Sequence, residues 1–402
     1  MQVYLVGGAV RDTLLNRPIT DKDFVVVGAN PDALLAQGFT QVGADFPVFL
    51  HPITHHEYAL ARLERKTGAG HTAFSIDSRP DVSLKDDLLR RDLTINALAI
   101  EVTGLFDDNP VTGEVIDYYG GLDDLAKKRL RHVSPAFCED ALRILRTARF
   151  FARFFDLGFS ICPTTITLMQ QMANQGELSH LSQERLWSES TKAMSEHAGF
   201  AYWQCLDELD ILRHLLPSLA NAWTNTTLKA RTLSALAQAH SLPIAWQFAL
   251  LMSSFVNQPN AHAHIQDCTI RLRAPKVCTQ TSLLLLDFVT LFTSSLTADM
   301  LLLLIEKSKA NLNSDTAHLL IDSLYLYQQA HKLPAIVSQD TAHTLLDEAI
   351  NCYHSVSIKD IDAQLTGADI GYAIKQLRLA RLAQFLQHIH INESALSISL
   401  GF

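Results

Sequence analysis

The chain has 402 residues, of which 48% are hydrophobic, with only 17 Gly and 13 Pro. This composition excludes a disordered protein and is enough for two to four packed domains. The formal net charge of −9 at pH 7 does not exclude a nucleic-acid partner, because such binding depends on where charges lie, and 20 of the 33 Lys and Arg residues fall within residues 1–195.

The composition also bears on compartment and redox state. The six cysteines are scattered without a Cys-x-x-Cys pair, which predicts reduced core residues and neither a zinc site nor a disulfide partner. Residues 232–266 contain no Lys, Arg, Asp or Glu, but polar residues interrupt the stretch, so we expect buried helices and no membrane span. No signal peptide precedes the first strand-like run at residue 3, so we expect a cytoplasmic protein.

The first element along the chain is a strand-like run, Val3–Val6, followed by Gly7-Gly8 and a helix-like segment from Val10. Glycines after a strand let backbone N–H groups approach a ligand closely, and the positive end of the helix points to the same place. This pattern favours a triphosphate, with Gly8 contributing its backbone and Arg11 its charge. Arg11 by itself would be read as an ordinary surface arginine.

Two carboxylates, Asp21 and Asp23, come next, ahead of the strand-like run Phe24–Val27. If the strand has begun by residue 21, alternation places both carboxylates on one face. Paired carboxylates on a strand suit Mg²⁺, which takes few protein ligands and uses substrate phosphates for the rest. A solvated loop is the alternative for Asp-x-Asp taken alone.

Two longer motifs follow, Arg90–Ala97 (RRDLTINA) and Glu139–Arg146 (EDALRILR). With them the chain resembles the class II tRNA nucleotidyltransferases, the bacterial CCA-adding enzymes, from about residue 1 to 190. The segment Gly43–His51 is similar to the CCA-adding branch and not to the poly(A) polymerase branch. The resemblance implies an enzyme that adds or repairs the 3′-terminal CCA of tRNA without a template, using CTP and ATP and releasing diphosphate.

Strand-like runs recur up to about residue 118, and helical periodicities follow to the end of the chain. The fold expected is an α/β head, polymerase-β-like by resemblance, followed by an all-helical part. The resemblance implies a head over residues 1–125, a helical neck over 126–195 that reads the base, and a helical body and tail over 196–402 that bind tRNA. Ser134 and Ser182 are expected to cap helices.

The resemblance also assigns roles in the head. Asp21 and Asp23 would be the catalytic metal ligands, and Glu57 is a candidate third carboxylate, with a solvated strand-end glutamate as the equal alternative. Arg91 would bind the nucleotide. Asp92 and Asn96 would recognise the ribose or hold the site together.

Residues 139–153 show the clearest charge pattern in the chain. If they form a single helix, their acidic and arginine side chains all lie within one half of its circumference. A solvated face of paired charges is the simple explanation, but four arginines against two acids exceed what pairing needs. In the family this helix reads the incoming base. Asp140 and Arg143 would contact the base, and Arg146 and Arg149 match further nucleotide-binding positions.

Two further segments carry expectations. Residues 65–72 are basic and broken by glycine, typical of a mobile loop, and in the family such a loop is associated with the switch from C to A addition. In the run Phe248–Ser254, two serines stand where some relatives carry a metal-binding His-Asp pair, so we expect a degenerate phosphohydrolase region with no hydrolase activity. His262 and His264 are expected in a surface turn.

Three alternatives stay open at this point, of which the first is an enzyme of the same fold with a different product. The chain could add only CC or only A, or it could polyadenylate, against which Gly43–His51 counts. It could be a catalytically silent tRNA-binding protein, against which five intact residues argue: Asp21, Asp23, Arg91, Asp140 and Arg143. The helical half could also be a protein-interaction scaffold.

Overall fold

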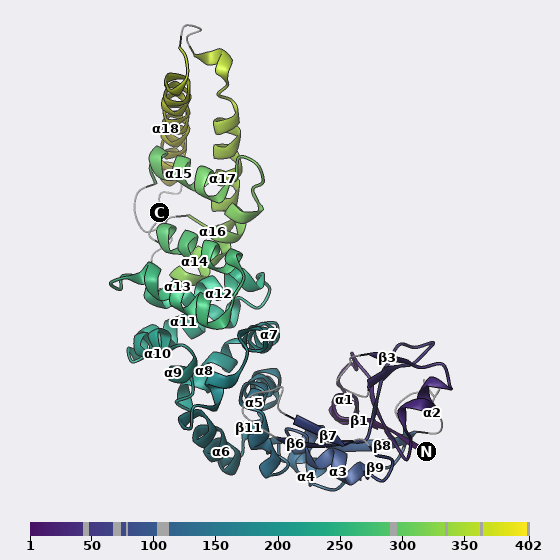
Figure 1. The fold of residues 1–402 in the computed structure, drawn as a ribbon. Helices are drawn as coiled ribbons and strands as arrows, with labels where there is room; N and C mark the ends of the chain where they lie inside the picture. Colours follow the sequence, from purple (N-terminus) through teal and green to yellow (C-terminus); the bar gives the residue numbers. More distant parts are fainter. Residues whose placement is uncertain are drawn as a thin grey trace. The chain divides into compact units, whose positions relative to one another are not determined.

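The structure is a computed structural model that describes residues 1–42, 48–66, 74–77, 79–102, 112–289, 296–333, 337–361 and 365–399. The chain forms two compact units, Met1–Leu215 and Leu216–Phe402 (Figure 1). Within the described residues, every helix is too short or too polar to cross a membrane. The segments Gly43–Pro47 and Thr67–Ala73, which include most of the CCA-type segment and of the 65–72 loop, lie outside the described residues.

Unit 1 begins with a mixed sheet of seven strands in the order β3-β4-β5-β2-β1-β8-β9. Only β2 and β5 pair in parallel, and the other neighbours are antiparallel. A separate hairpin pairs β6 (Leu63–Lys66) with β7 (Phe74–Asp77). The strands of the main sheet are β1 (Gln2–Val6), β2 (Asp23–Val27), β3 (Thr40–Val42), β4 (Val48–Leu50), β5 (Glu57–Leu60), β8 (Leu98–Val102) and β9 (Val115–Asp117).

The central strands are buried on both faces, which is why they read as continuous apolar runs in the sequence. Four of the five residues of β1 are buried, and so are the middle three of β2. On one side Tyr4 and Val25 pack with Leu84 and Leu88 of α3 (Leu84–Leu89), a short helix that begins with a capping box between Ser83 and Asp86. Central position and burial make this part of the sheet the rigid base of the site.

The strand register brings separate motifs to one edge of the sheet. Val6, the last residue of β1, pairs with Asp23, the first residue of β2. Val6 also pairs with Ala99 near the start of β8, and the Gly7 N–H donates to the carbonyl of Leu98 at 3.1 Å. The glycine turn, the aspartates and the residues before β8 therefore meet at the same place, although up to 90 residues separate them in sequence.

The helical part of unit 1 is built around α5, which packs against α7 and α8. Ser134 and Ser182 cap the elements that follow them, as expected. One short exception to the all-helical expectation is the parallel pair of two-residue strands β10 (Arg129–Leu130) and β11 (Ser160–Ile161). The other helices of this unit are α1 (Gly8–Leu14), α2 (Pro31–Leu35), α4 (Gly121–Ala126), α5 (Leu142–Arg153), α6 (Pro163–Asn174), α7 (Gln183–Met194), α8 (Phe200–Glu208) and α9 (Leu212–Leu215).

Unit 2 is helical throughout its described residues. In α12 every residue from Trp246 to Met252 is buried, which confirms buried helices in the charge-free stretch. The helices are α10 (Pro217–Ala222), α11 (Thr226–Gln238), α12 (Ile244–Met252), α13 (Ala261–Leu272), α14 (Lys276–Phe288), α15 (Ala298–Ser308), α16 (Asp315–His331), α17 (Gln339–His354) and α18 (Ala368–Ser399).

The region expected to be a degenerate metal site is an ordinary hydrogen-bonded core. Ser254 is fully buried, and its hydroxyl accepts from Trp223 Nε1 at 2.9 Å and lies 3.1 Å from Thr232 Oγ1. The expectation that His262 and His264 lie in a surface turn is wrong. The turn ends at Asn260, whose left-handed backbone precedes α13, and both histidines lie on that helix. Loss of hydrolase activity stays a prediction.

Candidate functional site

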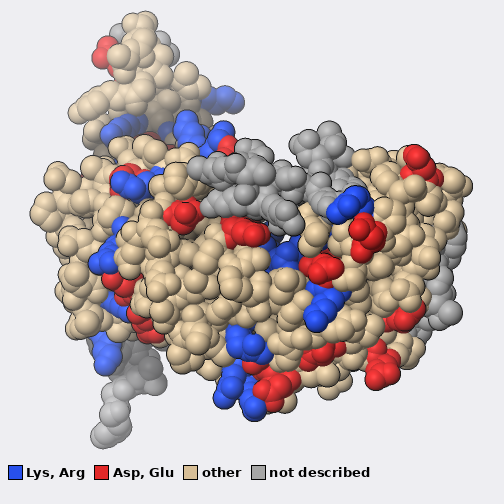
Figure 2. Space-filling view, turned by 60° about the horizontal axis from the view of Figure 1, so that its bottom comes forward, with Lys and Arg blue, Asp and Glu red and all other residues tan. Residues whose placement is uncertain are grey.

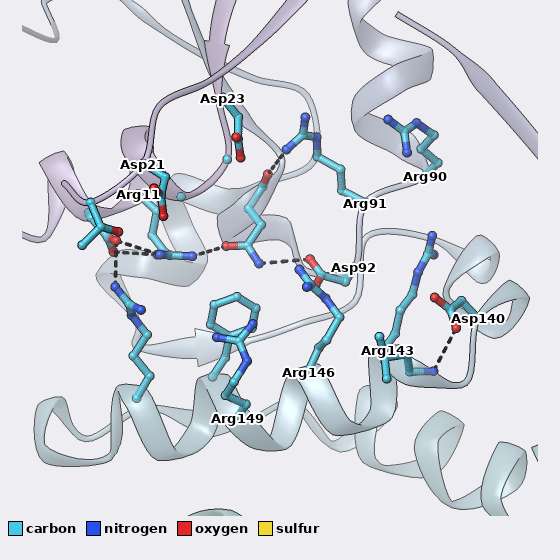
Figure 3. A pocket seen from close by; sticks show the side chains of 18 of the residues that line it. Arg11, Asp21, Asp23, Arg90, Arg91, Asp92, Asp140, Arg143, Arg146 and Arg149 are labelled. Atoms are coloured by element: carbon cyan, nitrogen blue, oxygen red, sulfur yellow. Dashed lines mark hydrogen bonds and ion pairs between the residues drawn. The ribbon is translucent and has the colours of Figure 1, made fainter. Parts of the chain in front are cut away.

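A pocket of about 500 Å³ opens where the glycine turn, the aspartates and α5 meet (Figure 3). Its lining includes eight arginines and five aspartates, so positive charge is in excess. Every residue predicted for the site lines this pocket except Glu57, namely Gly8, Arg11, Asp21, Asp23, Arg91, Asp140, Arg143, Arg146 and Arg149. On the face shown in Figure 2, Lys and Arg side chains lie interspersed with Asp and Glu.

Gly7 makes the turn between β1 and α1 possible. Its φ of 70° lies in the left-handed region, and a Cβ there would meet Arg91 Nη1 at 2.8 Å. Gly8 begins α1 two residues earlier than expected, and a Cβ on it would meet only Arg11 Nη2, at an ordinary 3.5 Å. Gly7 therefore fixes both the turn and the place of Arg91.

Replacing Gly7 with alanine should destabilise the protein by about 1–2 kcal/mol, because an L side chain is strained in this backbone conformation and Arg91 must also move. Urea unfolding of the purified variant measures this. Gly8→Ala is the matched control, because it adds the same methyl group one residue later without a close contact, and it should be neutral or slightly stabilising. Equal stability of the two variants would contradict this account.

Asp21 and Asp23 both line the pocket, but the strand β2 begins only at Asp23, so strand alternation is not what brings them together. In Figure 3 both lie across the pocket from Arg146 and Arg149. The pKa of Asp23 is raised because the surrounding protein desolvates the carboxylate and Asp21 adds a second negative charge, while Arg91 opposes the shift. A bound cation would relieve this repulsion.

Glu57 lies beside Asp23 in the parallel register of β2 and β5, but it does not line the pocket. Among the described residues, no three His, Cys, Asp or Glu side chains are grouped closely enough to hold a metal ion. A metal at Asp21 and Asp23 would therefore take its remaining ligands from substrate and water, which suits a hard ion such as Mg²⁺.

Arg11 is only 3% exposed and is held on every side. Its guanidinium donates through Nε and Nη2 to the two oxygens of Asp12, both at 2.8 Å, and through Nη1 to Asn96. It also lies 5.2 Å from the ring centroids of both Phe150 and Phe154. A guanidinium has five N–H groups, so two N–H groups are left for a phosphate, and much of its role is to join α1 to α5.

Asp92 is the centre of a second buried network. It accepts hydrogen bonds from Asn96 Nδ2 at 3.0 Å, Arg146 Nε at 2.7 Å and the N–H of Leu93 at 2.8 Å. Burial alone would raise the pKa of Asp92, but the Arg146 cation and these hydrogen bonds outweigh it, so the pKa lies well below the ordinary aspartate value. Asp92 thus ties the loop before β8 to α5.

The arginines of α5 line the pocket, but the helix starts later than expected. We predicted that Glu139 and Asp140 share the helix with Arg143, and this is wrong. Glu139 ends a 3₁₀ turn, Asp140 has an extended backbone, and α5 begins at Leu142. The physical reason is that the Asp140 side chain accepts the N–H of Leu142 at 3.0 Å, an alternative to helical backbone bonding.

Two ion pairs hold the arginine face of α5 in place. Arg149 Nε lies 2.7 Å from Glu189 on α7, with both side chains buried, and Arg153 Nη2 lies 3.1 Å from Asp12. The sequence interpretation gave no role to Arg185, which lines the pocket from α7 and pairs with Asp140. No spacing signal could have identified it, because 45 residues separate the two partners.

Two known family models match parts of this sequence. Residues 3–131 match the poly A polymerase head domain, and residues 158–222 match the probable RNA and SrmB-binding site of polymerase A. The chain is 56% identical over 217 residues to the "Multifunctional CCA protein" of Actinobacillus pleuropneumoniae serotype 5b, which is 54% of this chain and 51% of that protein. It is 52% identical over 220 residues to the "CCA-adding enzyme" of Actinobacillus succinogenes, 55% of this chain and 53% of that protein.

The chain thus spans about half the length of the curated relatives it matches. A solved structure of a CCA-adding enzyme in complex with ATP matches all of this chain and 90% of its own, with a TM-score of 0.62 and 21% identity, which shows a shared fold. The nucleotidyltransferase head followed by helices agrees with the fold expected from the sequence. In these segments, therefore, the chain is similar to the poly A polymerase head domain, to its RNA-binding partner domain and to proteins named for CCA addition.

Proposed function

We propose that this protein adds or repairs the 3′-terminal CCA of tRNA, taking nucleotides from CTP and ATP and releasing diphosphate. One observation carries the proposal: a single pocket holds two aspartates on one side and, on the other, an arginine-lined helix preceded by Asp140. The names of the relatives, and the solved complex of a CCA-adding enzyme with ATP, support the same activity. Two further solved structures show a CCA-adding enzyme in complex with CTP and a CCA-adding enzyme in complex with tRNA.

In this reaction the 3′-hydroxyl oxygen of tRNA forms a bond to the α-phosphorus, the bond to diphosphate breaks, and the hydroxyl proton is released. Similarity to the polymerase head domain and to CCA-adding proteins supports a divalent metal requirement. We propose Mg²⁺, held by Asp21 and Asp23, which when bound would stabilise the attacking and leaving oxygens. The excess of arginines would bind the triphosphate, with Gly8, Arg11 and Arg91 nearest the turn.

The base would be read by side chains alone. Cytosine and adenine each present an exocyclic amino donor beside a ring-nitrogen acceptor, which Asp140 and Arg143 can match. Arg146 and Arg149 would complete the nucleotide site from the same helix. In this proposal residues 1–125 form the head, 126–195 the base-reading neck, and 196–402 the body and tail that bind tRNA in the cytoplasm.

A direct test uses a tRNA transcript that lacks its last three nucleotides. The purified protein is incubated with it and CTP, ATP or both, and the products are sequenced. We expect addition of CC with CTP alone, CCA with both, and no extension of a control tRNA that already ends in CCA. Addition of only CC or only A would identify a partial-specificity enzyme, and long A tails would identify a poly(A) polymerase. If no nucleotide is added under any condition, the protein is not this enzyme, and the hypothesis of a catalytically silent tRNA-binding protein would be favoured.

A further inference from the structure

Arg185 on α7 forms a bidentate ion pair with Asp140. Its Nη2 donates to Oδ2 at 2.7 Å and its Nη1 donates to Oδ1 at 3.2 Å. Both side chains are about a quarter exposed, at 27% and 22%, and both line the pocket. A two-pronged guanidinium contact fixes the plane of a carboxylate as well as its position. Arg185 therefore sets the direction in which Asp140 presents its free acceptor positions.

The contacts of Asp140 leave little capacity for a ligand. Each carboxylate oxygen can accept about two hydrogen bonds. Oδ1 already accepts from the N–H of Leu142 at 3.0 Å and from Arg185 Nη1. Oδ2 accepts from Arg185 Nη2. One acceptor position thus remains, on Oδ2, and an ionised carboxylate offers no donor.

This single acceptor has a specific chemical preference. The exocyclic amino groups of cytosine and adenine can donate to it, whereas uracil and guanine carry carbonyl oxygens at the corresponding positions and would be repelled. Resting on the function proposed above, we propose that Arg185 is a specificity-determining positioning residue. It orients Asp140 so that one oxygen accepts an amino group and the pocket rejects UTP and GTP.

The element that carries Arg185 is itself fixed, as such a role requires. The hydroxyl of Ser182 caps the start of α7 by accepting the N–H of Arg185. One turn later, Glu189 is 3% exposed and pairs with Arg149 of α5 at 2.7 Å. The same two helices thus hold Arg185, the arginine face of α5 and, at the start of α5, Asp140.

The test compares CTP and UTP in single-nucleotide addition to tRNA that lacks CCA, using the parent chain and its variants. In Arg185→Ala the ratio of kcat/KM for CTP to that for UTP should fall at least about tenfold. Arg185→Lys should restore only part of it, because one ammonium cannot contact both oxygens as a fork. Lys192→Ala removes an exposed cation from the same helix that does not line the pocket, and the ratio should stay unchanged.

A double variant separates positioning from general damage. If Arg185 acts through Asp140, Asp140→Ala/Arg185→Ala should be no less selective than Asp140→Ala alone. Equal losses with CTP and UTP in both Arg185 variants, or selectivity losses that add in the double variant, would overturn the inference while leaving the proposed function intact. A parent protein that does not extend tRNA would overturn both. If Arg185→Ala fails to fold, the CTP to UTP selectivity of Arg185→Lys is compared with that of the parent instead.

Discussion

Replacing Asp21 or Asp23 with alanine is expected to abolish nucleotide addition and to leave tRNA binding nearly unchanged. The metal that these carboxylates would hold acts on the transition state, and its loss should lower the rate at least about a hundredfold. Affinity for RNA comes mainly from phosphate contacts elsewhere. Rates from single-turnover extension and dissociation constants from filter binding measure the two effects separately.

Asp32→Ala is the matched control, because Asp32 is an exposed acid on α2 that does not line the pocket. Its rate should equal that of the parent. Extension by Asp21→Ala or Asp23→Ala at more than a few percent of the parent rate would refute the metal assignment.

The pH dependence of the reaction follows from the same carboxylates. A cation binds the ionised form, and the pKa of Asp23 is raised, so activity should be complete above that pKa and decline as pH falls through it. Rates measured against pH at subsaturating Mg²⁺, where protons and the cation compete for the carboxylate, should therefore begin to decline at a higher pH than an ordinary aspartate would give.

Asp92→Ala is expected to cost about 1–3 kcal/mol of unfolding free energy and most of the activity. It leaves Asn96 and Arg146 without their buried partner. The expected cost lies below the range usual for a broken buried ion pair, because the Arg146 side chain is 35% exposed and water screens its charge. Urea unfolding of the parent and the variant measures the difference. The control is Asp123→Ala, which breaks a surface pair with Lys127 at 2.7 Å and should leave the unfolding free energy nearly unchanged.

The effect of Asp92 should also depend on pH. Its pKa in the folded protein is lowered, so its stabilisation is fully present above the ordinary aspartate pKa and is lost as pH falls toward the folded value. The stability gap between the parent and Asp92→Asn should therefore narrow on acidification below about pH 4. A gap that stays constant down to pH 3 would show that Asp92 does not stabilise as an ion.

The sequence predicted most of the site because each motif lies next to a strong local signal. The runs that became β1, β2 and β8 are apolar enough to be recognised without any partner, and the glycines and aspartates stand at their ends. Strands β3, β9, β10 and β11 are two or three residues long, too short for a periodicity. Their formation depends on pairing with distant segments.

The misplaced and missing parts have two physical causes. One is local competition between side chain and backbone within a turn, and the other is contact between residues far apart in sequence. Asp140 was predicted on the helix because periodicity cannot show that its side chain accepts the backbone N–H of Leu142, two residues later. The pairing of Arg185 with Asp140 and of Glu189 with Arg149 could not be predicted, because the partners in each pair are 40 residues or more apart in sequence. The pairing of Arg11 with Asp12 was adjacent in sequence, yet nothing there indicated that two phenylalanine rings would cover it.

The packing of Arg11 against Phe150 and Phe154 has a consequence for how such proteins can be recombined. The guanidinium belongs to α1 and the rings belong to α5 and the residue after it, so the matched head segment, residues 3–131, does not contain all that holds its own glycine turn together. Arg153 adds a second link from α5 back to Asp12. The smallest transferable module is therefore the head together with α5, and a chimaera cut between them would separate each arginine from its counterpart.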